Sequence, residues 1–269
     1  MKLSCLPVSF FQTIIEKKMS LFEWVSTAKK LGLDAVDISI LLVPDRTPRC
    51  ISEVKKQLLD GGLGITMITT YPDFTNPNKI QRERELDYFI ADIAVSAELG
   101  AKYLRVTAGQ LYEIADPEQT ADIAAEYILR SKLRADEYGI ELLFENHARP
   151  GVWDRVDFTY YADNFLLLLD KLKDSGIRVN FDTANIWSSG DDAVGLFKRI
   201  LPHVETIHVS DMNAPLSFCV IGEGKAPIRE ILSLAKASGW DGWLCIEEAS
   251  RTGIDGVEKA IKFVKYAWE

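Results

Sequence analysis

Short apolar segments, several of them rich in β-branched residues, alternate along the chain with longer segments whose apolar positions recur every three or four residues. The short segments are typical of buried parallel strands, and the longer ones of amphipathic helices. Eight strand–helix pairs follow one another in this way. The expected strands are Lys2–Leu6, Ala35–Ser39, Gly64–Thr69, Lys102–Thr107, Ile140–Glu145, Arg178–Asp182, Thr206–Ser210 and Trp243–Glu247.

Capping signals support the expected helices. Ser20 and Glu23 have the spacing of a capping box, in which each side chain bonds the backbone N–H of the other residue. Asp116 precedes a proline and a glutamine at the positions that begin a helix. Gly100 follows a long amphipathic segment and suits a helix C-terminus. The helix starts and stops are therefore marked independently of the hydrophobic period.

Eight βα repeats without a break in composition predict an α/β fold, a single (β/α)8 TIM barrel that forms one domain over residues 1–269. A chain of 269 residues suits such a barrel, which typically needs about 250. The alternative is an open, doubly wound sheet. It is disfavoured because the first strand leads into Pro7-Val8-Ser9-Phe10 and not into a glycine-rich phosphate-binding turn.

Four of the expected strands carry, at or near their C-terminal ends, a side chain that can bind a metal or transfer a proton. Side chains of a barrel strand alternate between the interior and the outer face, and the outer face must be apolar because helices cover it. On each of these strands an apolar residue directly precedes the polar one, so the polar one points inward. The four residues are Glu145, Asp182, His208 and Glu247.

The same alternation assigns directions to two further charged residues. It distinguishes Glu247 from its neighbour Glu248, which should point outward or toward the rim. On the fourth expected strand it turns Arg105 into the barrel, between the outward-facing Leu104 and Val106. A cation is therefore expected inside the barrel next to the strand that ends at Glu145.

The four strand ends are consecutive in the predicted barrel and so should meet at its C-terminal mouth. A single strand-end carboxylate is usually a helix cap or a surface charge. Three carboxylates and an imidazole together would repel one another unless a proton or a cation intervened. One nitrogen and three oxygen donors without a thiolate favour Mn²⁺, and Mg²⁺, Zn²⁺, Co²⁺ or Fe²⁺ also fit.

These residues lie within longer runs in which the chain resembles the sugar phosphate isomerase/epimerase group of the xylose isomerase-like TIM barrels. The resemblance extends over almost the whole chain and implies that the four strand-end residues bind one divalent metal ion. It also implies that Glu145 and Glu247 exchange protons with a substrate. The runs are Gly32–Asp37, Leu143–His147, Asn180–Asn185, Ile207–Asp211, Gly222–Gly224 and Gly242–Glu247.

The resemblance implies an isomerase or epimerase that acts on a sugar, a sugar phosphate or a related hydroxy-ketone through an enediolate. The same first step followed by loss of a β-hydroxyl would give a dehydratase of an inosose- or dehydroshikimate-like keto-polyol. Related sugar epimerases often carry His where this chain has Asn185, and Arg where it has Ala214. Both differences argue against a free ketohexose 3-epimerase. The residues expected to contact substrate are Arg105, His147, Asn185 and Glu223.

Other functions fit the sequence less well. A formal net charge of −9 without a basic strip argues against a nucleic-acid partner. Relatives resembling endonuclease IV need several histidines, whereas this chain has three. A two-metal xylose isomerase needs more acidic ligands than the strand ends provide. A non-catalytic barrel that binds a ligand remains an alternative from another class.

The sequence also predicts where the protein is found. Its first residues lack the pattern of a signal peptide, and no window reaches the roughly 18 apolar residues of a membrane span. We therefore expect a cytoplasmic protein with a small-molecule carbohydrate or keto-polyol substrate and no membrane partner. A homo-oligomer is compatible with the sequence.

Overall fold

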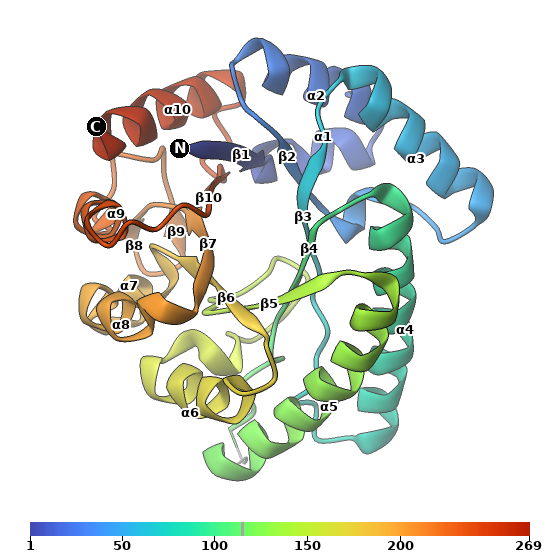
Figure 1. The fold of residues 1–269 in the computed structure, drawn as a ribbon, viewed down its shortest axis with the longest axis vertical. Helices are drawn as coiled ribbons and strands as arrows, with labels where there is room; N and C mark the ends of the chain where they lie inside the picture. The colour runs from blue at the N-terminus through green and yellow to red at the C-terminus, as the bar shows by residue number, and fades with distance from the viewer. Residues whose placement is uncertain (114–115) are drawn as a thin grey trace.

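The computed structural model describes residues 1–113 and 116–269, and within them eight parallel strands form one sheet (Figure 1). The order of the strands in the sheet is β1-β10-β7-β6-β5-β4-β3-β2. Ser4 Oγ on β1 donates to Asp37 Oδ2 on β2 at 3.0 Å, which joins the two ends of the sheet into a nearly closed barrel. The strands are β1 (Lys2–Leu6), β2 (Val36–Ser39), β3 (Ile65–Thr69), β4 (Tyr103–Val106), β5 (Glu141–Glu145), β6 (Arg178–Asp182), β7 (Val204–Val209) and β10 (Trp243–Glu247).

The predicted TIM barrel is confirmed, and all eight expected strands are present with ends that shift by at most two residues. Helices surround the barrel on its outside (Figure 1). The helices are α1 (Phe11–Ile15), α2 (Leu21–Lys30), α3 (Pro48–Gly61), α4 (Lys79–Leu99), α5 (Pro117–Tyr138), α6 (Ala162–Leu172), α7 (Asn185–Ser189), α8 (Ala193–Ile200), α9 (Ile228–Ala237) and α10 (Ile254–Trp268).

The helix caps form as the sequence predicts. Ser20 and Glu23 make both hydrogen bonds of a capping box at the start of α2. Asp116 Oδ1 accepts the backbone N–H of Gln119 at 2.9 Å at the start of α5. Gly100 ends α4 with φ +83°, a conformation that side chains with a Cβ rarely adopt. Local sequence thus sets where these helices begin and end.

Apolar side chains pack on both faces of the sheet, and the alternation of the strands separates the two sets. On the outer face, Phe144 of β5 stacks on Phe165 of α6 with ring centres 5.2 Å apart. Phe181 of β6 packs against Phe197 of α8 with the rings tilted by 56° and their centres 5.0 Å apart. A smaller inner cluster fills the barrel and comprises Met67, Tyr103, Leu143 and Cys245. Strand residues that alternate with the outer set therefore point into the barrel.

The segment after β7 forms a short element outside the barrel sheet. It contains an antiparallel hairpin of β8 (Met212–Ala214) and β9 (Ser217–Phe218). Leu216 in its turn has φ +57°, a left-handed conformation that is uncommon for a residue other than glycine. The sequence lacks the Asn-Gly or Asp-Gly signal of a tight hairpin, so the turn could not be recognised. Across residues 1–113 and 116–269, none of the helices has the length and apolar character needed to cross a membrane.

Candidate metal centre

Four potential metal ligands converge at the C-terminal mouth of the barrel. Each offers a donor atom, and these atoms all lie within 4.8 Å of one another. They come from β5, β6, β7 and β10, which are neighbours in the sheet. Three of the residues are fully buried, and the fourth, Glu247, keeps 15% of its side chain exposed. The structure thus brings together the strand-end residues Glu145, Asp182, His208 and Glu247.

His208 lies between two of the carboxylates. Its Nδ1 atom is 3.2 Å from Oε1 of Glu145 and 2.9 Å from Oε2 of Glu247. Burial by itself lowers the pKa of His208, but the two carboxylates outweigh burial and raise this pKa well above its ordinary value. The protonated imidazole places a positive charge between the carboxylates of Glu145 and Glu247.

Asp182 uses only one of its two carboxylate oxygens. Oδ1 accepts hydrogen bonds from the backbone N–H groups of Ala184 at 2.9 Å and Asn185 at 2.7 Å, and from Ser210 Oγ at 2.9 Å. The buried Oδ2 atom has no hydrogen-bond partner within the described residues. Burial, followed by the charges of Glu247 and Glu145, raises the pKa of Asp182 well above its ordinary value. A buried oxygen in this state fits a metal ligand.

Arg105 flanks the cluster on the side of Glu145. Its Nε atom is 2.7 Å from Oε2 of Glu145, and the N–H bond is not aligned with that oxygen, so the contact is an ion pair and not a hydrogen bond. The guanidinium also donates to the Thr70 carbonyl and stacks on Tyr71. Burial raises the pKa of Glu145, but Arg105 and His208 outweigh it and lower this pKa to about 2. Glu145 is therefore ionised near neutral pH.

His147 lies in the loop after β5, beside Glu145 and Arg105. Burial and then the charge of Arg105 lower its pKa to about 3, so the imidazole is neutral near pH 7. Its Nδ1 atom faces Oδ2 of Asp157 at 3.9 Å. Burial raises the pKa of Asp157 to about 8, although hydrogen bonds from Thr159 oppose this shift. A polar group without a net charge thus adjoins the cluster.

Asn185 and Glu223 are placed less directly. Asn185 is buried and donates its side-chain amide to the Asn146 carbonyl at 3.1 Å, which braces the turn that carries Asp182. Glu223 keeps 60% of its side chain exposed and lies 3.8 Å from Lys259. Substrate contact by either residue stays a prediction.

Glu248 turns away from the cluster, although it adjoins Glu247. Its Oε1 atom accepts the backbone N–H of Ser250 at 2.9 Å in the loop that follows the strand. The side chain is fully buried there, so it is covered more completely than a rim residue would be. Strand alternation thus distinguishes Glu247, which lies in the cluster, from Glu248, which does not.

A family model described as xylose isomerase-like TIM barrel matches residues 25–267. The chain belongs to the xylose isomerase-like TIM barrel family. An inosose dehydratase of Lacticaseibacillus casei is 26% identical over 152 residues, which cover 49% of this chain and 49% of that relative. An inosose dehydratase of Clostridium beijerinckii is 22% identical over 259 residues, or 84% and 83% of the two chains. The alignment with the first of these relatives thus spans about half of its length.

Solved structures of other proteins share the fold. The probable 3-DHS dehydratase AsbF involved in petrobactin synthesis from Bacillus anthracis superposes with a TM-score of 0.79 at 18% identity, covering 98% of this chain and 99% of that one. D-psicose 3-epimerase with D-tagatose from Clostridium cellulolyticum H10 gives a TM-score of 0.78 at 15% identity over both whole chains. At these identities the likeness establishes the barrel alone.

The sequence patterns did not single out the buried residues Asp37 and Asp157, which lie close to the cluster. Asp37 lies in the middle of β2 and accepts hydrogen bonds from Ser4 Oγ at 3.0 Å and Met67 N at 3.2 Å. It also offers an oxygen within 4.8 Å of donor atoms on His208 and Cys245. The other is Asp157, in the loop after β5. Asp37 lies in the run Gly32–Asp37, which is part of the family resemblance, and this was the signal in the sequence that could have indicated it.

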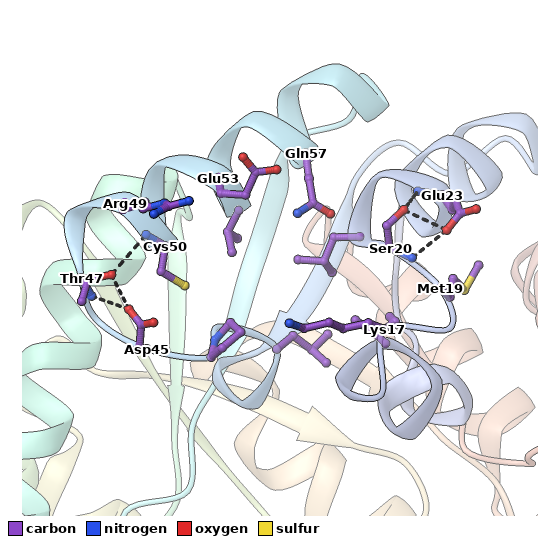
Figure 2. Close-up of a pocket in the computed structure, with 15 residues that line it drawn as sticks. Lys17, Met19, Ser20, Glu23, Asp45, Thr47, Arg49, Cys50, Glu53 and Gln57 are labelled. Atoms are coloured by element: carbon purple, nitrogen blue, oxygen red, sulfur yellow. Dashed lines mark hydrogen bonds between the residues drawn. The ribbon is translucent and has the colours of Figure 1, made fainter.

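A surface cavity of about 680 Å³ lies apart from this cluster, between the segment around α1 and the start of α2 on one side and α3 on the other (Figure 2). The capping residues Ser20 and Glu23 lie on one wall, and Thr47 and Arg49 on the opposite wall. None of the four converging residues lines it. Burial, charge and unsatisfied oxygens mark the barrel mouth as the candidate site in preference to this surface cavity.

Proposed function

We propose that the protein is a divalent-metal-dependent isomerase or epimerase that acts on a sugar, a sugar phosphate or a related hydroxy-ketone. The observation that carries this proposal is the convergence of four donors from neighbouring strands, including a buried Asp182 oxygen without a hydrogen-bond partner in the described residues. One imidazole and three carboxylates favour Mn²⁺, and Mg²⁺, Zn²⁺, Co²⁺ or Fe²⁺ are compatible with the same donors. When bound, the ion would polarise a substrate carbonyl and stabilise negative charge on its oxygen.

Glu145 and Glu247 are the proposed acid/base residues, in addition to their proposed ligand role. Glu145 is ionised because Arg105 and His208 lower its pKa to about 2, so an oxygen is available to accept a proton from the carbon next to the carbonyl. Return of the proton to the opposite face of that carbon by Glu247 would give epimerisation. Return at the neighbouring carbon would give aldose–ketose isomerisation.

Arg105 and His147 are the proposed substrate contacts with the strongest structural support. Arg105 places a buried cation at Glu145, where it can stabilise negative charge on a substrate oxygen. His147 adds a neutral imidazole on the same side of the site. We assign weaker substrate contacts to Asn185 and Glu223, since the first braces the Asp182 turn and the second is largely exposed.

Dehydration is the second candidate function. It is favoured by the names of relatives, which include inosose dehydratases and a probable 3-DHS dehydratase. The first proton transfer would be the same, and a β-hydroxyl would then leave with a proton from an acidic side chain. In either case we expect a small-molecule carbohydrate or keto-polyol substrate and a cytoplasmic enzyme, and homo-oligomers are compatible with this proposal.

Deuterium exchange tests the shared first step. The Mn²⁺-loaded protein would be incubated in D₂O with ketoses, ketose phosphates, inososes and hydroxypyruvate, and the products analysed by NMR and mass spectrometry. We expect deuterium at the carbon next to the carbonyl of at least one substrate. Loss of the mass of water would identify dehydration. No exchange across the panel would support a non-catalytic binding barrel instead.

Two substitutions assign the acid/base roles. Glu145→Gln and Glu247→Gln should each reduce turnover at least about 100-fold, because a carboxamide cannot carry the proton. Glu141→Gln is the matched control, since Glu141 begins the same strand but is exposed and far from the barrel mouth. Near-normal turnover by either site variant would remove that residue from the mechanism.

A further inference from the structure

The loop after β5 holds a buried carboxyl group against a buried imidazole. Oδ2 of Asp157 lies 3.9 Å from Nδ1 of His147. Within residues 1–113 and 116–269, neither atom has a hydrogen-bond partner. Asp157 is fully buried, and His147 is 7% exposed. Two facing polar atoms of this kind are costly unless they bond to each other.

We propose that Asp157 is a positioning residue that holds the imidazole of His147 in one orientation, with Nε2 presented to the substrate. The inference rests on the proposed function, in which His147 contacts the substrate. A carboxyl group bonded to one imidazole nitrogen fixes both the tilt of the ring and the role of the other nitrogen.

Thr159 fixes the carboxyl group of Asp157. Its backbone N–H and its Oγ–H both donate to Oδ1 of Asp157 at 2.8 Å. The same hydroxyl oxygen accepts the backbone N–H of His147 at 3.1 Å and lies 3.3 Å from the Glu145 carbonyl. Because Oδ1 is fully engaged, Oδ2 is the oxygen that remains for His147. One threonine therefore ties Asp157 to the backbone at the end of β5.

Backbone hydrogen bonds hold the surrounding loop in place. Asp157 N donates to the Ala148 carbonyl at 2.6 Å, and Phe158 N donates to the Gly109 carbonyl at 2.8 Å in the loop after β4. Leu111 N bonds the Val156 carbonyl on the same side at 2.8 Å. In the proposed pair, rotation of the two side chains, and not movement of the loop, closes the 3.9 Å separation.

The geometry also limits what else could join the two groups. Two hydrogen bonds of ordinary length at a tetrahedral water span about 4.5 Å, so the separation of 3.9 Å suits a direct bond after side-chain rotation better than a water bridge. The ring of Trp153 packs edge-on against that of His147, with centres 6.3 Å apart. Trp153 thus restricts the tilt of the imidazole, and Asp157 selects the nitrogen that is engaged.

Nitrogen-15 NMR of the histidine rings tests the pair without requiring turnover. The chain has three histidines, and His203→Gln would assign one set of signals. Spectra of the metal-free and Mg²⁺-loaded protein at neutral pH should show His147 as a single neutral tautomer. Asp157→Ala should convert this to a mixture of two tautomers. Asp157→Asn should also show a single tautomer, with the proton on Nε2. Its amide can donate to Nδ1 while Oδ1 still accepts from Thr159.

Two controls complete the experiment. Asp154→Asn alters an exposed carboxylate of the same loop and should leave the His147 signals unchanged. Once a substrate is known, Asp157→Ala should lower kcat about tenfold or more, with a smaller change in KM. A mixture of tautomers in the wild-type protein, or unchanged His147 signals in Asp157→Ala, would overturn the inference. A fixed tautomer without deuterium exchange would overturn the proposed function alone.

Discussion

A buried aspartate ends β6 and another lies just after β7, and their carboxylates are satisfied in different ways. Oδ1 of Asp182 accepts three hydrogen bonds, whereas Oδ2 has no hydrogen-bond partner in the described residues. Asp211 distributes four donors over both oxygens. These donors are the backbone N–H groups of Met212, Gly222, Gly224 and Ala226, at 2.9–3.1 Å.

The difference supports the ligand role proposed for Asp182 and a structural role for Asp211. All four donors to Asp211 are backbone groups, so this carboxylate folds the loop of residues 212–226 around itself. The donors to Asp182 orient the carboxylate and leave one oxygen directed at Glu145, His208 and Glu247. A fully bonded carboxylate stabilises the loop around it. Burial and neighbouring carboxylates raise the pKa of Asp182, which means that its negative charge is unfavourable there unless a proton or a cation balances it.

The largest expected effect is on metal binding at the β6 turn. Asp182→Asn should keep the hydrogen bonds to Oδ1 but remove the negative charge, and so weaken Mn²⁺ binding at least about 100-fold with a similar loss of turnover. Titration calorimetry and the exchange assay measure the two effects. Wild-type affinity for Mn²⁺ in this variant would contradict the assignment of Asp182 as a ligand.

The next effect is on stability at the β7 turn. Asp211→Ala should lower the free energy of unfolding by about 2–4 kcal/mol, because four backbone N–H groups lose their acceptor. Asp211→Asn, which can still accept at one oxygen, should lose less. Urea denaturation of the metal-free proteins would measure both. A change below about 0.5 kcal/mol for Asp211→Ala would show that the loop does not depend on this carboxylate.

The smallest effect has the opposite sign and depends on pH. Folding raises the pKa of Asp182, so the metal-free protein loses stability as the pH rises from about 4, the ordinary pKa of aspartate, toward the folded value. Metal-free Asp182→Asn should therefore be more stable than wild type at pH 7. The difference should vanish below pH 4, where both side chains are neutral. Thermal melting in EDTA across this pH range measures the stability of both proteins. A variant that is less stable than wild type at pH 7 would contradict the prediction.

The barrel and its four converging residues could be predicted because strand alternation is a local property. Phe144 and Phe181 had to face helices, which left Glu145 and Asp182 to face the interior. Neighbouring parallel strands then brought the four ends together. Prediction of the fold required only the hydrophobic period of the sequence and the known length of a βα unit.

The loops could not be predicted in this way. Asp157 meets His147 because backbone hydrogen bonds join the loops after β4 and β5, and no sequence period records such contacts. The β8–β9 hairpin depends on Leu216 in a left-handed conformation. Glu223 lies in a glycine-flanked segment that suggested a ligand site, yet the two glycine N–H groups bond Asp211. The contact of Glu223 with substrate stays a prediction.

The central claim is that one divalent ion binds among the four strand-end residues, and a crystal grown with Mn²⁺ tests it most directly. Anomalous diffraction near the manganese edge should give one strong peak within coordination distance of Glu145, Asp182, His208 and Glu247. The same experiment on Asp182→Asn should show a much weaker peak. An empty barrel mouth in wild-type crystals, with manganese absent or bound elsewhere, would contradict the account.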